Sequence, residues 1–228
     1  MIGDAGIVVV TGTDTGVGKT IVTAALAARG LAAGRRVAVV KPAQTGTAAF
    51  GAGETSDIET VRRLLGPADV MYAVGGEYPD PLSPLAAAEV SGRPPVYLGD
   101  VLALVGDLAE RHDLVLVEGA GGVLVPMGAS AWTVADLAVA ARAPAVVVAR
   151  AGLGTINHTA LTLEALARRG IAAAVVIGAW PAAPELVHER NLVDLPGQLI
   201  GRLPDGAGRL DDSTFRAAAP AWFGTIDR

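Results

Sequence analysis

The chain has only two lysines, and both lie in stretches whose residue types suit phosphate transfer. Lys19 lies near the end of GTDTGVGKT (residues 12–20), and Lys41 opens KPAQTG (residues 41–46), while every other one of the 18 basic residues is arginine. A lysine kept among arginines suggests a site that needs a compact, strongly hydrated charge, which the wide guanidinium fork cannot replace. The alternative is that two surface lysines remain by chance in an arginine-rich chain.

The first stretch is typical of a phosphate-binding loop between a strand and a helix. Free N–H groups of such a loop cradle phosphate oxygens, its lysine reaches the outer phosphates, and its final hydroxyl ligates Mg²⁺. Five residues separate Gly12 from Gly18, where the common loop has four, so this loop is a variant. The alternative is a glycine-rich turn that binds no phosphate. The residues expected to contact a nucleotide here are Gly16, Val17, Gly18, Lys19, Thr20 and Ile21.

A second candidate site is LVLVEGAGG (residues 114–122), an apolar strand that ends in a carboxylate and small residues. A carboxylate beside a phosphate loop can hold Mg²⁺ directly or through water, and small residues let the backbone approach a ligand. The alternative is that the acid caps the next helix. The residues assigned to the site are Glu118, Gly119, Ala120 and Gly121.

Two helix starts carry further candidates. Asp57 falls in the first turn of a helix that begins near Ser56, where the helix dipole alone accounts for an acid. The run GLGTINHT (residues 152–159) enters a helix after an apolar strand, and its free N–H groups, with Thr155 and Asn157, could receive a carboxylate. The alternative there is plain helix capping by Asn157.

These candidates need strands and helices to position them. Apolar β-branched runs alternate with alanine-rich, helix-period stretches, which predicts a doubly wound, mostly parallel α/β sheet in a single domain spanning 1–228. The expected strands are 7–10, 37–40, 114–117, 145–148, 173–177 and 198–203, with 123–125 a weaker one. The expected helices are 20–33, 56–65, 84–91, 100–111, 134–140, 158–169 and 184–192. Residues 66–84 and those after 205 are the least readable.

Composition narrows the class of partner. The formal net charge of -5, with scattered arginines, argues against nucleic acid and against anionic membrane, so a small molecule is expected. The absence of cysteine excludes disulfides and thiolate metal sites and suits a reducing compartment. No basic segment precedes the first apolar run, so a signal peptide is not expected, and we predict a cytoplasmic protein.

From the first strand to about residue 205, the chain resembles dethiobiotin synthetases, which are P-loop NTPase-type α/β ligases. The resemblance rests on TGTDTGVGKT, KPAQTG, VEGAGG followed by VLVP, and GLGTINHT. It implies ATP- and Mg²⁺-dependent biotin synthesis in which an amine of 7,8-diaminononanoate takes up CO₂ as a carbamate. ATP phosphorylates the carbamate, and the second amine closes the ureido ring. A carbamate and a γ-phosphate are both anions, so joining them requires positive charge.

The resemblance also assigns roles. Lys19 would hold the phosphates, Lys41 would bridge the carbamate and the transferring phosphoryl group, and Thr45 would bind the diamine. The Mg²⁺ ligands would be Thr20, Asp57 and Glu118. The family works as homodimers, which implies that the substrate's distant carboxylate is bound across the interface by Gly152, Leu153, Gly154, Thr155 and Asn157.

One departure concerns the base of the nucleotide. The family commonly reads adenine with an asparagine after the sixth major strand, where this chain has Gly178-Ala179-Trp180-Pro181. Other nucleoside triphosphates could therefore serve. The nucleotide-facing segment Pro204, Asp205 and Gly206 still matches. The alternatives are a nucleotide switch like the partition ATPases, or another P-loop amidoligase; the partition ATPases usually carry a signature lysine where this chain has Asp14.

Overall fold

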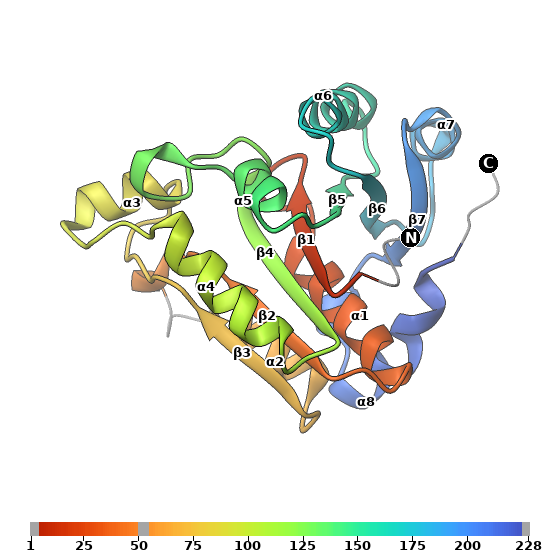
Figure 1. The fold of residues 1–228 in the computed structure, drawn as a ribbon. Helices are drawn as coiled ribbons and strands as arrows, with labels where there is room; N and C mark the ends of the chain where they lie inside the picture. Colours follow the sequence, from red (N-terminus) through yellow and green to blue (C-terminus); the bar gives the residue numbers. More distant parts are fainter. Residues whose placement is uncertain (1–4, 50–54, 225–228) are drawn as a thin grey trace.

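A computed structural model describes residues 5–49 and 55–224, so the ends of the expected domain lie outside the described residues. Its described strands form one sheet of seven, in the order β3-β2-β4-β1-β5-β6-β7, with every neighbouring pair parallel. Because all the strands run the same way, their carboxyl ends share one edge, which is where open α/β sheets bind ligands. The predicted doubly wound α/β class is confirmed (Figure 1).

The strands are the short apolar runs of the sequence. They are β1 (Ile7–Gly12), β2 (Val37–Lys41), β3 (Val70–Val74), β4 (Leu114–Gly122), β5 (Ala145–Ala149), β6 (Ala173–Trp180) and β7 (Gln198–Pro204). The central strands are buried on both faces, which is why they read as continuous apolar runs and not as alternating ones. Side-chain direction still alternates: Val8 and Val10 face one core cluster and Val9 faces the other.

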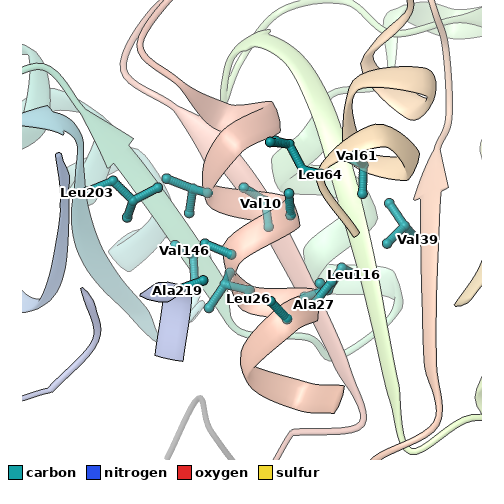
Figure 2. Packing of buried hydrophobic residues seen from close by; sticks show 14 of the residues in the cluster. Val10, Leu26, Ala27, Val39, Val61, Leu64, Leu116, Val146, Leu203 and Ala219 are labelled. Carbon is teal, nitrogen blue, oxygen red and sulfur yellow. The ribbon is translucent and has the colours of Figure 1, made fainter. Parts of the chain in front are cut away.

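Helices cover both faces of the sheet. They are α1 (Lys19–Ala32), α2 (Asp57–Leu65), α3 (Pro84–Ser91), α4 (Leu98–Ala109), α5 (Val134–Ala140), α6 (Thr155–Ala167), α7 (Leu186–Asp194) and α8 (Asp212–Ala218). Buried residues of α1, α2 and α8 share one cluster, in which Leu26 of α1 packs with Val10 and Leu116 of the sheet (Figure 2). The opposite cluster takes side chains from α3 to α6. Among the described residues, no helix is long and apolar enough to cross a bilayer.

Three expectations about the elements are wrong or incomplete. Residues 123–125 form a turn instead of a strand, because β4 continues to Gly122, and the N–H of Val125 then folds back to the Gly122 carbonyl at 3.2 Å. Strand β3 lies in the segment 66–84, where the sequence predicted no strand. It is a half-exposed strand at the edge of the sheet, so its burial pattern is weak. Helix α8 was not predicted either, although Asp211 caps it through the N–H of Thr214 at 2.9 Å.

The ends of two helices bear on the site. Ser56 caps α2, since its hydroxyl accepts the N–H of Glu59 at 3.1 Å. The Glu59 carboxylate pairs with the exposed side chain of Arg62 at 3.0 Å. Helix α6 begins at Thr155, three residues earlier than expected, with Gly154 as its N-cap. Asn157 therefore lies inside the helix, and the reading of it as a cap is wrong.

Candidate active site

The carboxyl edge of the sheet carries a cleft of about 850 Å³ at the start of α1. Most of the residues predicted from the phosphate-binding loop, KPAQTG and the strand-end carboxylate line it together. These predicted lining residues are Gly16, Gly18, Lys19, Thr20, Ile21, Lys41, Thr45, Asp57, Glu118, Ala120 and Gly121. The structure thus brings into one cleft predicted residues from four separate parts of the sequence.

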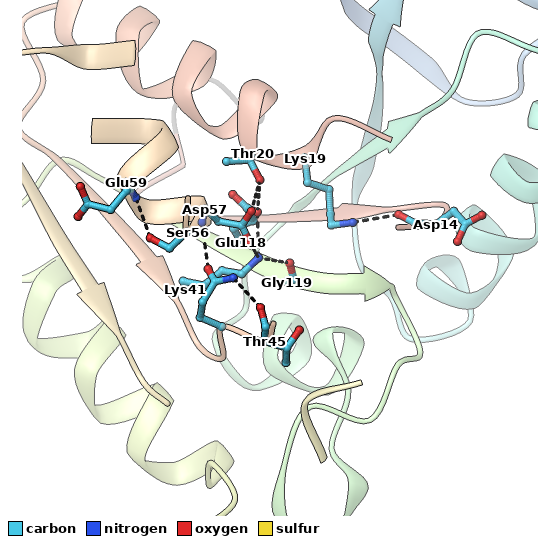
Figure 3. Close-up of polar contacts among 11 residues, drawn as sticks. Asp14, Lys19, Thr20, Lys41, Thr45, Ser56, Asp57, Glu59, Glu118 and Gly119 are labelled. Atoms are coloured by element: carbon cyan, nitrogen blue, oxygen red, sulfur yellow. Dashed lines mark hydrogen bonds and ion pairs between the residues drawn. The ribbon is translucent and has the colours of Figure 1, made fainter. Parts of the chain in front are cut away.

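Lys41 stands at the centre of this cleft, at the end of β2. Its Nζ lies 2.6 Å from Asp57 Oδ2 and 2.9 Å from Glu118 Oε1 and donates to the Gly119 carbonyl at 3.0 Å (Figure 3). The Lys41 residue is 3% exposed and Glu118 is 2% exposed. Buried charges require partners of this kind, because an unpaired ion in the interior is strongly destabilising. Glu118 lies inside β4 and binds Lys41, so the alternative that it caps the next helix is wrong.

Electrostatics at Lys41 keep both partners charged. Burial alone would lower the pKa of Lys41, but Glu118 and Asp57 outweigh it, and the pKa lies above its usual value. Burial would raise the pKa of Asp57, but the ammonium of Lys41 outweighs that effect, and this pKa lies below its usual value. The cleft therefore holds an ammonium and a carboxylate ready to act on a charged ligand.

Thr20 connects the same two carboxylates from the first turn of α1. Its Oγ1 lies 2.8 Å from Asp57 Oδ1 and 2.9 Å from Glu118 Oε1, and its single proton can serve one of them at a time. Three hard oxygen donors therefore converge, which is the donor set that Mg²⁺ prefers. No group of three or more acidic, histidine or cysteine side chains suited to a metal is found among the described residues. This is compatible with Mg²⁺, which commonly takes one or two carboxylates and keeps waters.

Lys19 occupies the mouth of the phosphate-binding loop. It is 8% exposed, and its Nζ donates to the backbone carbonyl of Asp14 at 2.9 Å, a loop-closing contact that sequence reasoning did not predict. Burial lowers the pKa of Lys19, and the nearby charge of Lys41 lowers it further. The Asp14 carboxylate in turn pairs with Arg150 at 2.5 Å, which joins the loop to the end of β5.

The residues expected to face the base lie next to the loop and not within the cleft lining. A Cβ placed on Gly178 would lie 2.0 Å from the carbonyl oxygen of Val17, so β6 and the phosphate-binding loop are in backbone contact. The N–H of Asp205 donates to the Trp180 carbonyl at 2.7 Å, and this bond ties the end of β7 to the end of β6. A second cavity of about 340 Å³, beside Trp180, includes two of the expected residues, Pro204 and Asp205. The remaining two, Ala179 and Gly206, line neither cavity.

The segment expected to bind the distant carboxylate is separate from the cleft, since none of Gly152, Leu153, Gly154, Thr155 and Asn157 lines it. Leu153 is 84% exposed, and Asn157 is exposed in the first turn of α6. The Thr155 hydroxyl is buried with no hydrogen-bond partner. Asn191 of α7 orders the loop by donating to the carbonyls of Ala151 at 2.8 Å and Gly152 at 3.0 Å, a contact that the sequence did not indicate.

Sequence reasoning missed several residues of the cleft wall. Gln44 belongs to KPAQTG, so its place in a motif was a usable signal, but no role was assigned to it. The segment before α3 also lines the cleft, and Pro84 starts the helix as predicted. The unpredicted lining residues are Thr15, Gln44, Thr60, Pro81, Leu82, Ser83, Pro84 and Val125.

Comparison with known families and proteins identifies relatives that match most of the chain. A family model described as an AAA domain matches residues 7–205. The ATP-dependent dethiobiotin synthetase BioD of Rhodococcus jostii is 53% identical over 222 residues, covering 95% of this chain and 94% of that protein. Proteins of the same name from Frankia casuarinae and Streptomyces coelicolor are 53% and 50% identical, covering 93% and 95% of this chain and 90% and 91% of theirs.

Solved structures support the fold alone. The MinC:MinD cell division complex of Aquifex aeolicus matches with a TM-score of 0.56 at 16% identity, covering 94% of this chain and 86% of that one. A ParA family ATPase from Chlorobium tepidum matches with a TM-score of 0.52 at 13% identity, covering 95% and 88%. The P-loop type of sheet predicted from the sequence is thereby confirmed.

Proposed function

This chain belongs to the ATP-dependent dethiobiotin synthetase family, and we propose that the cleft around Lys41 is where it joins a carbamate to the γ-phosphoryl group of a nucleotide. The enzyme is a ligase of biotin synthesis that forms carbon–nitrogen bonds: it closes a ring from diaminononanoate and CO₂ at the expense of ATP. The observation that carries the proposal is a buried ammonium held by two carboxylates beside a phosphate-binding loop.

The reaction proceeds in three steps. An amine nitrogen attacks CO₂ and loses a proton, which gives a carbamate. A carbamate oxygen then attacks the γ-phosphorus, and ADP leaves. The second amine attacks the carbon of this mixed anhydride and loses a proton, the carbon–oxygen bond breaks, and phosphate departs with the oxygen. The second step joins two anions, so positively charged donors aimed at the transferring group supply most of the catalysis.

Two lysines fit this task from opposite sides. Lys19 lies on the phosphate-binding loop, where it would exchange the Asp14 carbonyl for phosphate oxygens. Lys41 lies deeper, and its ammonium would contact the carbamate and the γ-phosphate together. Thr45, on the wall next to Lys41, would bind a diamine nitrogen.

We also propose that Thr20, Asp57 and Glu118 hold Mg²⁺, because their oxygens converge at hydrogen-bonding distance. When bound, Mg²⁺ would supply charge neutralisation at the phosphates. The carboxylates of Asp57 and Glu118 would then be shared between the ion and Lys41, which keeps the ammonium near the phosphates. The donor set has too few carboxylates to enclose the ion, which suits a metal that enters with the nucleotide.

The position of the segment assigned to the substrate's distant carboxylate supports a homodimer. The five residues from Gly152 to Asn157 assigned to the distant carboxylate do not line the cleft of their own chain. Exposed apolar side chains accompany them, with Leu153 84% exposed and Leu161 58% exposed. We propose that a second copy covers this surface and presents the loop to its partner's cleft. We further propose that the enzyme works in the cytoplasm and binds small molecules, not nucleic acid or membrane.

The test is phosphate release from ATP with and without 7,8-diaminononanoate plus bicarbonate. The proposal predicts that release depends on the diamine and matches the ureido product mole for mole. The competing class is a nucleotide switch of the partition ATPase kind, whose fold is similar. Such a switch would hydrolyse ATP at a rate that the diamine does not change. Another amidoligase would respond to a different amine acceptor.

A further inference from the structure

Gln44 is fixed in the wall of the cleft, three residues beyond Lys41 in the sequence. It is 6% exposed. Its backbone N–H donates to the Gly76 carbonyl at 2.8 Å, and its own carbonyl accepts the N–H of Tyr78 at 2.9 Å. The segment that follows β3 therefore holds the Gln44 backbone, and the side chain leaves from a rigid point.

The carboxamide of Gln44 spans two backbone groups in one orientation. Its Oε1 accepts the N–H of Asp57 at 3.1 Å, and its Nε2 donates to the Thr45 carbonyl at 3.1 Å. The Asp57 N–H can only donate and the Thr45 carbonyl can only accept, so the amide cannot be reversed without losing both bonds. The two bonds therefore fix the orientation of the carboxamide in the cleft wall.

The Asp57 N–H needs such a partner because of its position. Asp57 is the first residue of α2, and the first four N–H groups of a helix have no partner within the helix. Ser56 satisfies the N–H of Glu59, while Gln44 satisfies that of Asp57. The same residue carries the carboxylate that contacts Lys41 and Thr20. The orientation of Asp57 is thus set from its backbone by Gln44.

We propose that Gln44 is a positioning residue, which holds the backbone of Asp57 so that its carboxylate faces Lys41 and Thr20 and accepts the nucleotide-bound metal. The inference rests on the proposed role of Asp57 as a metal ligand. Groups that orient a ligand without touching the ion commonly change metal affinity by about 10–100-fold. Gln44 thereby links the motif that supplies Lys41 to the helix that supplies Asp57.

The experiment measures binding of a non-hydrolysable ATP analogue by calorimetry, with and without Mg²⁺, in the full-length enzyme. Gln44→Met keeps the size of the side chain and removes both bonds. We expect the gain in affinity that Mg²⁺ provides to fall by about 10-fold, while affinity without Mg²⁺ stays within about twofold of wild type. Gln44→Ala serves in its place if circular dichroism shows that methionine is not accommodated.

Ser56→Ala is the matched control. It removes the other cap of α2, the bond to Glu59, and should lower the melting temperature by about 2–4 °C without changing the Mg²⁺ effect. A double variant, Gln44→Met with Asp57→Asn, should lose no more of the Mg²⁺ effect than Asp57→Asn alone, because Gln44 acts through Asp57. That non-additivity distinguishes positioning from a separate contact with the ligand.

The inference would be overturned by an unchanged Mg²⁺ effect in Gln44→Met, or by an equal loss of affinity with and without Mg²⁺ in that variant. An equal loss of the Mg²⁺ effect in Gln44→Met and Ser56→Ala, or additive losses in the double variant, would overturn it as well. These binding measurements are made without the diamine. Failure of diamine-dependent turnover in the wild type would therefore contradict the proposed reaction while leaving the role of Gln44 standing. If wild-type turnover depends on the diamine but one of the overturning results above is found, only the role of Gln44 is contradicted.

Discussion

Lys41 Nζ lies 2.9 Å from Glu118 Oε1, and the register of two neighbouring strands puts them there. Val40 of β2 pairs with Val117 of β4, so the next residue of each strand emerges at the same edge of the sheet. Lys19 of the phosphate-binding loop lines the cleft at the same edge. The sheet itself thus aligns the charges of the cleft.

Replacing Lys41 with arginine should reduce turnover by at least about 100-fold, the usual effect of removing one preorganised donor to developing charge. Arginine keeps the charge, but its planar fork does not fit a site shaped by two carboxylates and a carbonyl. Turnover is measured by formation of the ureido product, with a melting curve to verify folding. Near wild-type turnover would contradict the assigned role. Lys41→Met is a poorer probe, since it leaves the buried carboxylate of Glu118 and the half-buried carboxylate of Asp57 uncompensated and should cost about 3–5 kcal/mol of stability.

The shared metal site predicts a common effect of two charge-neutralising changes. Asp57→Asn and Glu118→Gln should each raise the Mg²⁺ concentration that gives half-maximal rate, because each removes a charged oxygen ligand. The measurement is a Mg²⁺ titration of the rate at saturating diamine. If Asp57→Asn changes only the melting temperature, the helix dipole explains this acid and the metal assignment fails for it.

Base selectivity should be weak. Gly178 offers only backbone groups, and the Trp180 ring already lies 5.2 Å from the guanidinium carbon of Arg202. Binding of the phosphates by the loop, in contrast, does not depend on the base. We expect CTP, GTP and UTP to be used within roughly tenfold of ATP, a difference of about 1.4 kcal/mol. Competition among the triphosphates in the ring-closing assay measures this, and a preference for ATP above about a hundredfold would show that backbone groups read adenine.

The contact between β6 and the phosphate-binding loop predicts that Gly178→Ala is harmful. The added methyl would lie 2.0 Å from the Val17 carbonyl oxygen, so the loop must move. Overpacking of this kind costs about 1–3 kcal/mol, and the displaced loop should bind nucleotide more weakly. Gly106→Ala in α4 is the matched control, because a Cβ there meets nothing within 4 Å. The control should stabilise the helix slightly and leave nucleotide affinity unchanged; an unchanged affinity in Gly178→Ala would refute the contact.

Asn191 gives a prediction about the substrate loop. Asn191→Ala removes the two donors that hold the carbonyls of Ala151 and Gly152. We expect a higher KM for the diamine with little change in the KM for ATP, because the loop does not line the nucleotide cleft. The neighbouring variant Arg190→Ala, which breaks only an exposed pair with Asp194, should leave both constants unchanged. Equal shifts in both KM values would indicate general destabilisation instead.

Much of the cleft could be predicted because its residues stand at strand ends. Lys41 and Glu118 each follow an apolar run, and parallel strands bring such ends to one edge. Asp57 could be placed at a helix start, but its contact with Lys41 depends on how α2 packs, so its role could be taken only from the resemblance.

Other features could not be predicted from the sequence because tertiary structure determines which groups they contact. Gln44 bonds an N–H 13 residues away, and Asn191 bonds a carbonyl 40 residues away. The KPAQTG motif contains Gln44 but does not indicate its partner, and nothing local marks Asn191. Strand β3 has a weak pattern because it lies at the edge of the sheet, half exposed. The apolar residues at 123–125 suggested a strand, but no strand of the described sheet pairs with them there.

The most direct test of the central claim follows the oxygen that carbamate gives to phosphate. The enzyme is supplied with ATP, diamine and ¹⁸O-labelled CO₂, and the reaction is stopped before the label exchanges with water. If a carbamate oxygen attacks the γ-phosphorus, each phosphate released with the ureido product carries one labelled oxygen. Phosphate without label would show that water attacks the γ-phosphorus, and would contradict the assignment of this cleft to carbamate phosphorylation.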